Sequence, residues 1–362
     1  MEAKDTFPGP DRRVRARAAR SNDAGRFETQ RRQAVDDGWA RDSDLPLLRT
    51  EVGLERARSA ITYNRSPDLP FDRSINPYRG CEHGCIYCFA RPSHAFLNLS
   101  PGLDFETRLI ARPGLGAVLA GELRRTAYRV ATIAIGTNTD PYQPIEAEHR
   151  VMRELVEVLA TFRHPLAITT KGTLIERDLD VLAAMAVQNL LQVGISVTTL
   201  DPGLSRRLEP RAAAPARRLA VIRRLARAGV SVRVMVAPVI PGLTDHELES
   251  ILSAARDSGA TAAGWIALRL PLEVSPLFQD WLARNEPGRA ARVMRAVRDI
   301  HGGRDYDPEW GHRMRGQGPW SDLIAQRFAR ATARLGLSVA LPALRTDLFA
   351  PPPRPGDQLR LL

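Results

Sequence analysis

The chain has 362 residues, of which 44% are hydrophobic, so it is long and apolar enough to bury a large core with extensions around it. We find no apolar run of the length that crosses a membrane and no charged-then-apolar start typical of a signal peptide, so we expect a cytoplasmic protein without a membrane span. Its formal net charge is +11, with 52 Lys and Arg residues against 41 Asp and Glu, a balance that favours an anionic partner such as nucleic acid.

Residues 1–70 are predicted to form a basic, partly disordered extension. Five arginines and no acidic residue lie between Arg12 and Arg20, and few apolar side chains are present to offset the entropy of ordering. Apolar residues become more frequent after Leu45, and the segment from Val52 to Tyr63 predicts a short strand or a wrapping segment.

After residue 70, short apolar runs alternate with helical periodicity, which is typical of a parallel β/α architecture. Six such units are fewer than the eight of a closed barrel, so residues 71–270 are predicted to form an α/β fold, a partial (β/α)6 TIM-like barrel. Residues 271–350 are predicted to be a helical C-terminal region, and residues 351–362 a Pro-rich tail. The six strands are expected at 74–78, 130–136, 166–170, 191–198, 230–236 and 264–270.

The three cysteines of the chain, Cys81, Cys85 and Cys88, follow the first predicted strand directly. An odd number argues against a disulfide framework, and a four-thiolate zinc site lacks its fourth cysteine. A 4Fe-4S cluster held by three cysteines leaves one iron open to another ligand. Alternatively, His94 completes a Cys3His zinc site in a nucleic-acid-binding protein without catalysis.

The C-x-x-x-C-x-x-C spacing, with Tyr87 before the last cysteine, resembles the radical S-adenosylmethionine (SAM) superfamily. Within it, segments 74–81, 90–94, 136–146 and 170–172 resemble the group that includes spore photoproduct lyase and is labelled DNA-repair-photolyase-like, in particular a bacterial subgroup of unassigned substrate. This resemblance implies a 4Fe-4S cluster on the three cysteines, bound SAM and a flavodoxin-like or ferredoxin-like reductant. It also implies a 5'-deoxyadenosyl radical that abstracts hydrogen from substrate, in a lyase-like or transferase-like reaction.

The loop after the second predicted strand is dense in polar groups. The resemblance implies that this loop contacts the amino group of the bound cofactor, with Gly136, Thr137, Asp140 and Glu146 as the candidate residues. An ordinary turn at Asp140 and Pro141 is the alternative interpretation.

Other candidates lie after the third and fourth predicted strands. Lys171 is one of only two lysines in a chain that otherwise uses arginine, and it follows the third strand. Its ammonium is expected to project toward the cofactor face and, with Asp140, to act on the bound cofactor or substrate. The resemblance places Ser196 against the cofactor's ribose, while Arg211 or Arg218 is expected to pair with the cofactor carboxylate or a substrate phosphate. Solvated or interior packing roles remain open for each of them.

The final candidates concern hydrogen return and partners. Spore photoproduct lyases, in the family pattern, return hydrogen through a cysteine outside the cluster triad, which this chain lacks, so Tyr142 and Tyr306 are the candidate replacements. The last five residues, from Gln358 to Leu362, resemble a peptide that docks bacterial repair proteins on the sliding clamp.

Overall fold

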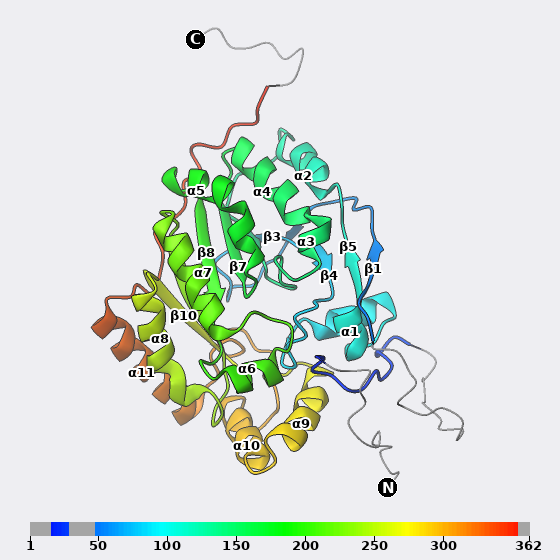
Figure 1. Cartoon of the computed structure of the whole chain (residues 1–362), viewed down its shortest axis with the longest axis vertical. Coiled ribbons are helices and arrows are strands. Elements are labelled where there is room, and N and C mark those ends of the chain that lie inside the picture. Colours follow the sequence, from blue (N-terminus) through cyan, green and yellow to red (C-terminus); the bar gives the residue numbers. More distant parts are fainter. Residues whose placement is uncertain (1–15, 29–47, 354–362) are drawn as a thin grey trace.

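The structure is a computed structural model that describes residues 16–28 and 48–353 (Figure 1). The predicted disorder of most of the N-terminal extension, and the clamp-like peptide from Gln358 to Leu362, lie outside the described residues. The division of the chain at residues 70, 270 and 350 remains a prediction.

A seven-stranded sheet forms the centre of the fold, in the order β10-β9-β8-β7-β6-β3-β2. All neighbouring pairs from β3 to β10 are parallel, and only β2 is antiparallel, at one edge. This strand order is linear among the described residues, so the barrel is partial, as predicted. The strands are β2 Ile61–Tyr63, β3 Arg73–Ile75, β6 Ile133–Ile135, β7 Leu166–Thr170, β8 Leu191–Ser196, β9 Val232–Val239 and β10 Ala262–Ala267.

Each of the six parallel strands falls at one of the six predicted positions, because short β-branched and apolar runs are buried there. In β7, for example, Leu166, Ile168 and Thr170 are buried while the residues between them are partly exposed. The predicted strand or wrapping segment near Val52 is also present, as β1 Glu51–Leu54 and β2. Strand β1 pairs with β5 Arg108–Ala111, which also pairs with β4 Tyr78–Arg79 in a small second sheet.

Helices cover the sheet and close its lower end in Figure 1. The face of α4 toward the sheet carries Val151, Leu155 and Leu159, all fully buried, as their helical spacing predicted. The helices are α1 Leu103–Thr107, α2 Leu115–Leu123, α3 Glu146–His149, α4 Val151–Thr161, α5 Leu179–Val187, α6 Pro202–Leu208, α7 Pro215–Arg227, α8 Leu248–Asp257, α9 Val274–Asn285, α10 Ala290–Ile300 and α11 Gly318–Leu335.

The C-terminal region is helical, as predicted, and two of its helices pack near the cysteines. Helices α9 and α10 lie beside α6 in Figure 1. Their buried apolar side chains form one core cluster with Cys85, Ile86 and Tyr87, and the indole nitrogen of Trp281 donates to the carbonyl of Arg207 at 2.9 Å. Within the described ranges, no helix combines the length and apolar composition that a membrane crossing needs.

Candidate active site

The cysteine loop, residues 81–88, follows β4 and carries three enclosed thiols. Cys81 and Cys85 are buried and Cys88 is partly buried. The three sulfur atoms do not all lie within 4.8 Å of one another. Among the described residues, no two of these sulfur atoms lie with a ring nitrogen of His94 inside the same distance of one another. Thiolates that share one zinc ion lie about 3.8 Å apart, given Zn–S bonds of about 2.3 Å in a tetrahedron. The three thiols are therefore not gathered around one point, as a single zinc ion would require.

A buried arginine is hydrogen-bonded to the backbone of the cysteine loop. The Arg91 guanidinium donates to the carbonyl oxygens of Gly84 at 3.1 Å and Cys85 at 3.0 Å, and it forms a 2.5 Å ion pair with Glu106. On the other side of the loop, the side chain of Gln143 accepts from the Glu82 amide at 2.7 Å. These contacts fix the path of the loop backbone. The positions of the three thiols are therefore set by hydrogen bonds of the protein and not by a group that the thiols bind.

Burial is also the main influence on the ionisation of the three thiols. It raises the pKa of Cys81, Cys85 and Cys88, and nearby acidic groups add to the effect at Cys81 and Cys85. A bound group that takes all three as thiolates must therefore supply positive charge and displace protons, as iron ions do.

Tyr87, which precedes the last cysteine, is fixed by a residue that the sequence had not singled out as a site residue. The Tyr87 hydroxyl donates to the carboxylate of Glu209, which also accepts from the hydroxyl of Thr198 at 2.9 Å and pairs with the buried Arg218. Burial alone would raise the pKa of Glu209, but the charges of Arg218 and Lys171 lower it to about 2. Glu209 is therefore an anion, and its ion pair takes up the Arg218 guanidinium, which was predicted to pair with the cofactor carboxylate or a substrate phosphate.

Lys171 and Ser196 lie beside this network, at the carboxyl ends of β7 and β8. The ammonium of Lys171 lies 6.0 Å from the centroid of the Tyr87 ring, and its charge lowers the pKa of Cys88 and Cys85 against the larger effect of burial. Neither the Lys171 ammonium nor the Ser196 hydroxyl has a hydrogen-bond partner among residues 16–28 and 48–353. Both groups are thus available to a ligand at this edge of the sheet.

The loop after β6 is anchored to β7 through Asp140. One carboxylate oxygen of Asp140 accepts from the hydroxyl of Thr170 at 2.6 Å, and the other accepts from the backbone amide of Lys171 at 2.7 Å. His83 lies 3.3 Å from the same carboxylate. Burial would raise the pKa of Asp140, but His83 and these donors hold it at about 2.

Gly136 begins this loop with a backbone φ of +91°, a conformation that glycine adopts without strain. Its Cα lies so close to β7 that an added Cβ would come within 1.9 Å of the carbonyl oxygen of Thr169. Thr137 follows, partly exposed at the same edge of the sheet. The predicted loop residues, except Glu146, are therefore gathered where β6 and β7 end.

The other predicted site residues have protein partners of their own. Glu146 is fully buried, where it accepts from the hydroxyl of Tyr78 and pairs with a guanidinium. The buried Tyr142 hydroxyl donates to the carboxylate of Asp178 at 3.1 Å. Arg211 pairs with Glu82 of the cysteine loop at 2.7 Å.

Arg269, two residues beyond β10, is a further cation beside the cysteine loop that the sequence reading missed. Its guanidinium carbon lies 4.2 Å from the centroid of the Phe89 ring, next to Cys88. Burial lowers its pKa, while the nearby hydroxyl of Tyr306 raises it. Tyr306 is partly exposed and packs edge-on against His301. The only available signal was the position of Arg269 at the end of the sixth predicted strand.

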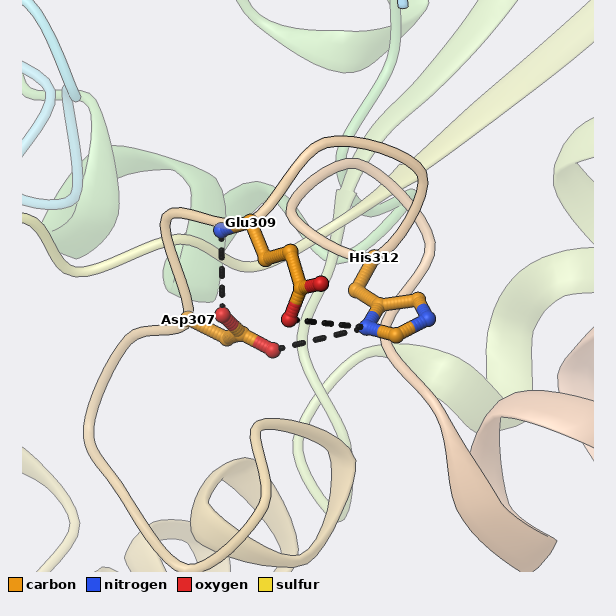
Figure 2. A group of neighbouring side chains, drawn as sticks. All are labelled: Asp307, Glu309 and His312. Carbon is orange, nitrogen blue, oxygen red and sulfur yellow. Dashed lines mark hydrogen bonds and ion pairs between the residues drawn. The ribbon is translucent and has the colours of Figure 1, made fainter.

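A separate group of ligating side chains lies between α10 and α11 (Figure 2). The Nδ1 atom of His312 faces Asp307 at 3.7 Å and Glu309 at 3.8 Å, and the Asp307 carboxylate accepts from the Glu309 amide at 3.0 Å. The group contains no cysteine, and its contacts stabilise a local turn.

Comparison with known proteins identifies the family. Residues 75–255, which include the cysteine loop and β6 to β9, match the radical SAM superfamily. The chain belongs to that superfamily. Radical SAM enzymes use a 4Fe-4S cluster and SAM and need a reductant, so the protein is an enzyme with these cofactors, as predicted. The three enclosed thiols on a preformed loop fit such a cluster.

The chain also resembles individual proteins. It is 42% identical over 283 residues to an uncharacterized protein of Mycobacterium tuberculosis, covering 73% of this chain and 82% of that protein. It is 25% identical over 197 residues to an uncharacterized protein of Methanocaldococcus jannaschii, covering 54% of this chain and 71% of that one. A spore photoproduct lyase variant superposes with a TM-score of 0.57 at 15% identity, covering 79% of this chain and 80% of the other, which shows a shared fold.

Proposed function

We propose that this radical SAM enzyme binds its 4Fe-4S cluster through Cys81, Cys85 and Cys88 and acts on a nucleic acid substrate. The observation that carries the proposal is the position of the cysteine loop. It lies beside the carboxyl ends of β7 and β8, where the Lys171 ammonium and the Ser196 hydroxyl have no partner among the described residues. Ligands of parallel β/α folds bind at this edge.

When bound, the cluster and SAM supply a 5'-deoxyadenosyl radical, and the protein supplies position and charge. Lys171 is suited to hold an anionic group of the cofactor, because its compact ammonium faces the loop without a competing acid bonded to it. Ser196 offers a hydroxyl at the next strand end. Thr137 and the backbone at Gly136 line the same edge and complete the proposed cofactor contacts.

The remaining predicted residues are proposed to act through others. Asp140 positions the loop after β6, since both of its oxygens are taken by protein donors. Arg218 orients Glu209, and Glu209 orients Tyr87. Arg211 ties the end of α6 to the cysteine loop, and Glu146 supports the start of α4. These are positioning residues.

Tyr306 is the better of the two tyrosine candidates for returning a hydrogen atom to the product. It is partly exposed and near Arg269, which contacts the residue after Cys88. The hydroxyl of Tyr142 is buried and already bonded to Asp178. We therefore assign hydrogen return to Tyr306 and a structural role to Tyr142.

A nucleic acid substrate is supported by the net charge of +11 and by Arg269, a cation without a hydrogen-bond or ion-pair acceptor among the described residues. One solved spore photoproduct lyase is complexed with a dinucleoside spore photoproduct. The sliding-clamp peptide would add a second link to DNA and remains a prediction.

The test titrates the reconstituted enzyme with DNA and RNA at low and moderate salt and measures 5'-deoxyadenosine. We expect one of them to bind, with an affinity that falls steeply as salt rises, and to increase the yield. No binding at low salt, or binding without an increased yield, would contradict a nucleic acid substrate. Metal analysis of the anaerobically purified protein tests the zinc alternative, which requires stoichiometric zinc and no iron.

A further inference from the structure

A basic cavity of about 640 Å³ lies next to the cysteine loop, between α6, α9 and residues 16–20. We call it the basic groove. Only one acidic side chain, that of Glu209, is among the residues that line it. Its arginines come from three separate segments of the chain: Arg17, Arg20, Arg206, Arg207 and Arg284.

The positive charge of the basic groove is only partly neutralised. Arg207 pairs with Glu286 at 2.7 Å, and Arg284 pairs with Asp280 at 2.5 Å. Arg20 and Arg206 are exposed, and neither has a hydrogen-bond or ion-pair acceptor within the described ranges. The groove therefore attracts an anionic partner, and a surface of this kind guides association through long-range electrostatics.

One wall of the basic groove is bonded directly to the cysteine loop. The amide of Ile86 donates to the carbonyl of Leu208 at 3.0 Å, at the end of α6. The hydroxyl of Tyr87 donates to the carboxylate of Glu209, and Glu209 is one of the residues that line the groove. A short hydrogen-bonded path thus runs from the groove to the residues between Cys85 and Cys88.

The opposite wall reaches the same loop through a buried acid. The amides of Ala18 and Ala19 donate to the carboxylate of Glu106 at 3.1 and 3.0 Å. Glu106 pairs with Arg91, which donates to the carbonyl of Cys85. Both walls therefore pack on the loop that is proposed to hold the cluster.

The basic groove is separate from the proposed cofactor and substrate edge of the sheet. Its lining includes neither Lys171 nor Ser196, and it also excludes Arg269. A partner in the groove can therefore approach the loop while the carboxyl edge of β7 and β8 is filled by other ligands. This geometry favours an electron donor over a substrate, because a substrate must reach that edge.

We propose that the basic groove docks the acidic, one-electron carrier protein that reduces the cluster, an inference that rests on the proposed function. The carrier loses one electron and the cluster gains it, with no bond made or broken. Charge complementarity brings the carrier to the groove, and the hydrogen bonds of Tyr87 and Ile86 connect the groove to the loop that would hold the cluster.

The test uses the full chain with Arg20→Gln and Arg206→Gln combined, and reduced flavodoxin as the probe. The matched control combines Arg223→Gln and Arg330→Gln, two exposed arginines of α7 and α11 outside the groove. Binding of labelled flavodoxin is measured by anisotropy on both the cluster-free and the reconstituted proteins. Production of 5'-deoxyadenosine is then measured with flavodoxin and, separately, with dithionite.

We expect the groove variant to bind flavodoxin about ten-fold more weakly at low salt and to lose flavodoxin-driven turnover by a similar factor. Its dithionite-driven turnover, and both properties of the control, should match the parent. Parent-like binding by the groove variant, an equal loss in the control, or a loss of DNA binding in place of flavodoxin binding would overturn the proposal. Failure of the proposed function would appear differently, as no dithionite-driven turnover in any protein.

Discussion

Arg91 and Glu106 form an ion pair at 2.5 Å with both side chains fully buried, and the same guanidinium holds the backbone of the cysteine loop. Breaking such a pair leaves a buried charge without a partner, at a cost of about 3–5 kcal/mol. Arg91→Met should therefore lower the free energy of unfolding by about this amount and reduce iron incorporation on reconstitution. Urea denaturation and iron analysis measure the two effects.

The control for this variant is Asp280→Asn, which breaks the more exposed i,i+4 pair between Asp280 and Arg284. It should change the stability by less than about 1 kcal/mol and leave the iron content unchanged. Equal behaviour of the two variants would show that the Arg91 pair does not organise the loop.

Lys171→Ala should retain the iron content of the parent and lose most 5'-deoxyadenosine production. The ammonium has no hydrogen-bond partner among the described residues, so its removal breaks no hydrogen bond of the fold, whereas a bound cofactor would lose a cationic contact. Lys171→Arg keeps the charge and should restore part of the turnover. Turnover by the Ala variant at the parent rate would show that Lys171 does not contribute a contact to the bound cofactor.

Gly136→Ala should destabilise the protein severely, because the added Cβ would lie 1.9 Å from the Thr169 carbonyl oxygen at a φ of +91°. Gly121→Ala is the matched control, since nothing lies within 4 Å of the added Cβ there and the residue is inside α2. The control should gain about 0.5–1 kcal/mol of stability. Thermal denaturation compares the pair, and similar melting temperatures would contradict the close packing of β6 on β7.

His164 should make the protein less stable in mild acid. Burial lowers its pKa to about 4, and its ring accepts from the Tyr128 hydroxyl at 2.7 Å while donating to the Pro165 carbonyl. The unfolded chain takes up the proton near pH 6.5, so stability is lost as pH falls from about 6.5 toward 4. Between pH 7.5 and 5 this loss is about 2 kcal/mol.

His164→Gln removes the titrating ring, so its own loss over that pH range should be smaller than the parent's by the same amount. Other buried histidines, such as His94, contribute equally to both proteins and cancel in the difference. Urea denaturation at the two pH values gives the comparison. Identical losses would show that His164 is not buried as a neutral ring.

The parallel strands could be predicted because each apolar run is a signal contained within a few neighbouring residues. The observed ends of some strands differ from the predicted ends. The first strand, β3, ends at Ile75 and not at Tyr78, since Pro77 has no amide to donate. The fifth, β9, continues to Val239, beyond the predicted end at residue 236.

The cysteines were also predictable, because their spacing carries the chemistry. The partners of the loop were not, since they are set by tertiary contacts. Glu209 meets Tyr87 across 122 positions of sequence, and Arg218 was expected to bind an anionic ligand until the fold supplied Glu209 as its partner. No periodicity in the chain reports such pairs.

The most direct test of the account is anaerobic reconstitution with iron and sulfide, followed by addition of dithionite and SAM and analysis for 5'-deoxyadenosine. The account predicts about four irons per chain in the parent and clear formation of 5'-deoxyadenosine, which Cys85→Ala abolishes without unfolding the protein. Stoichiometric zinc without iron, or release of 5'-deoxyadenosine by Cys85→Ala at the parent rate, would contradict it.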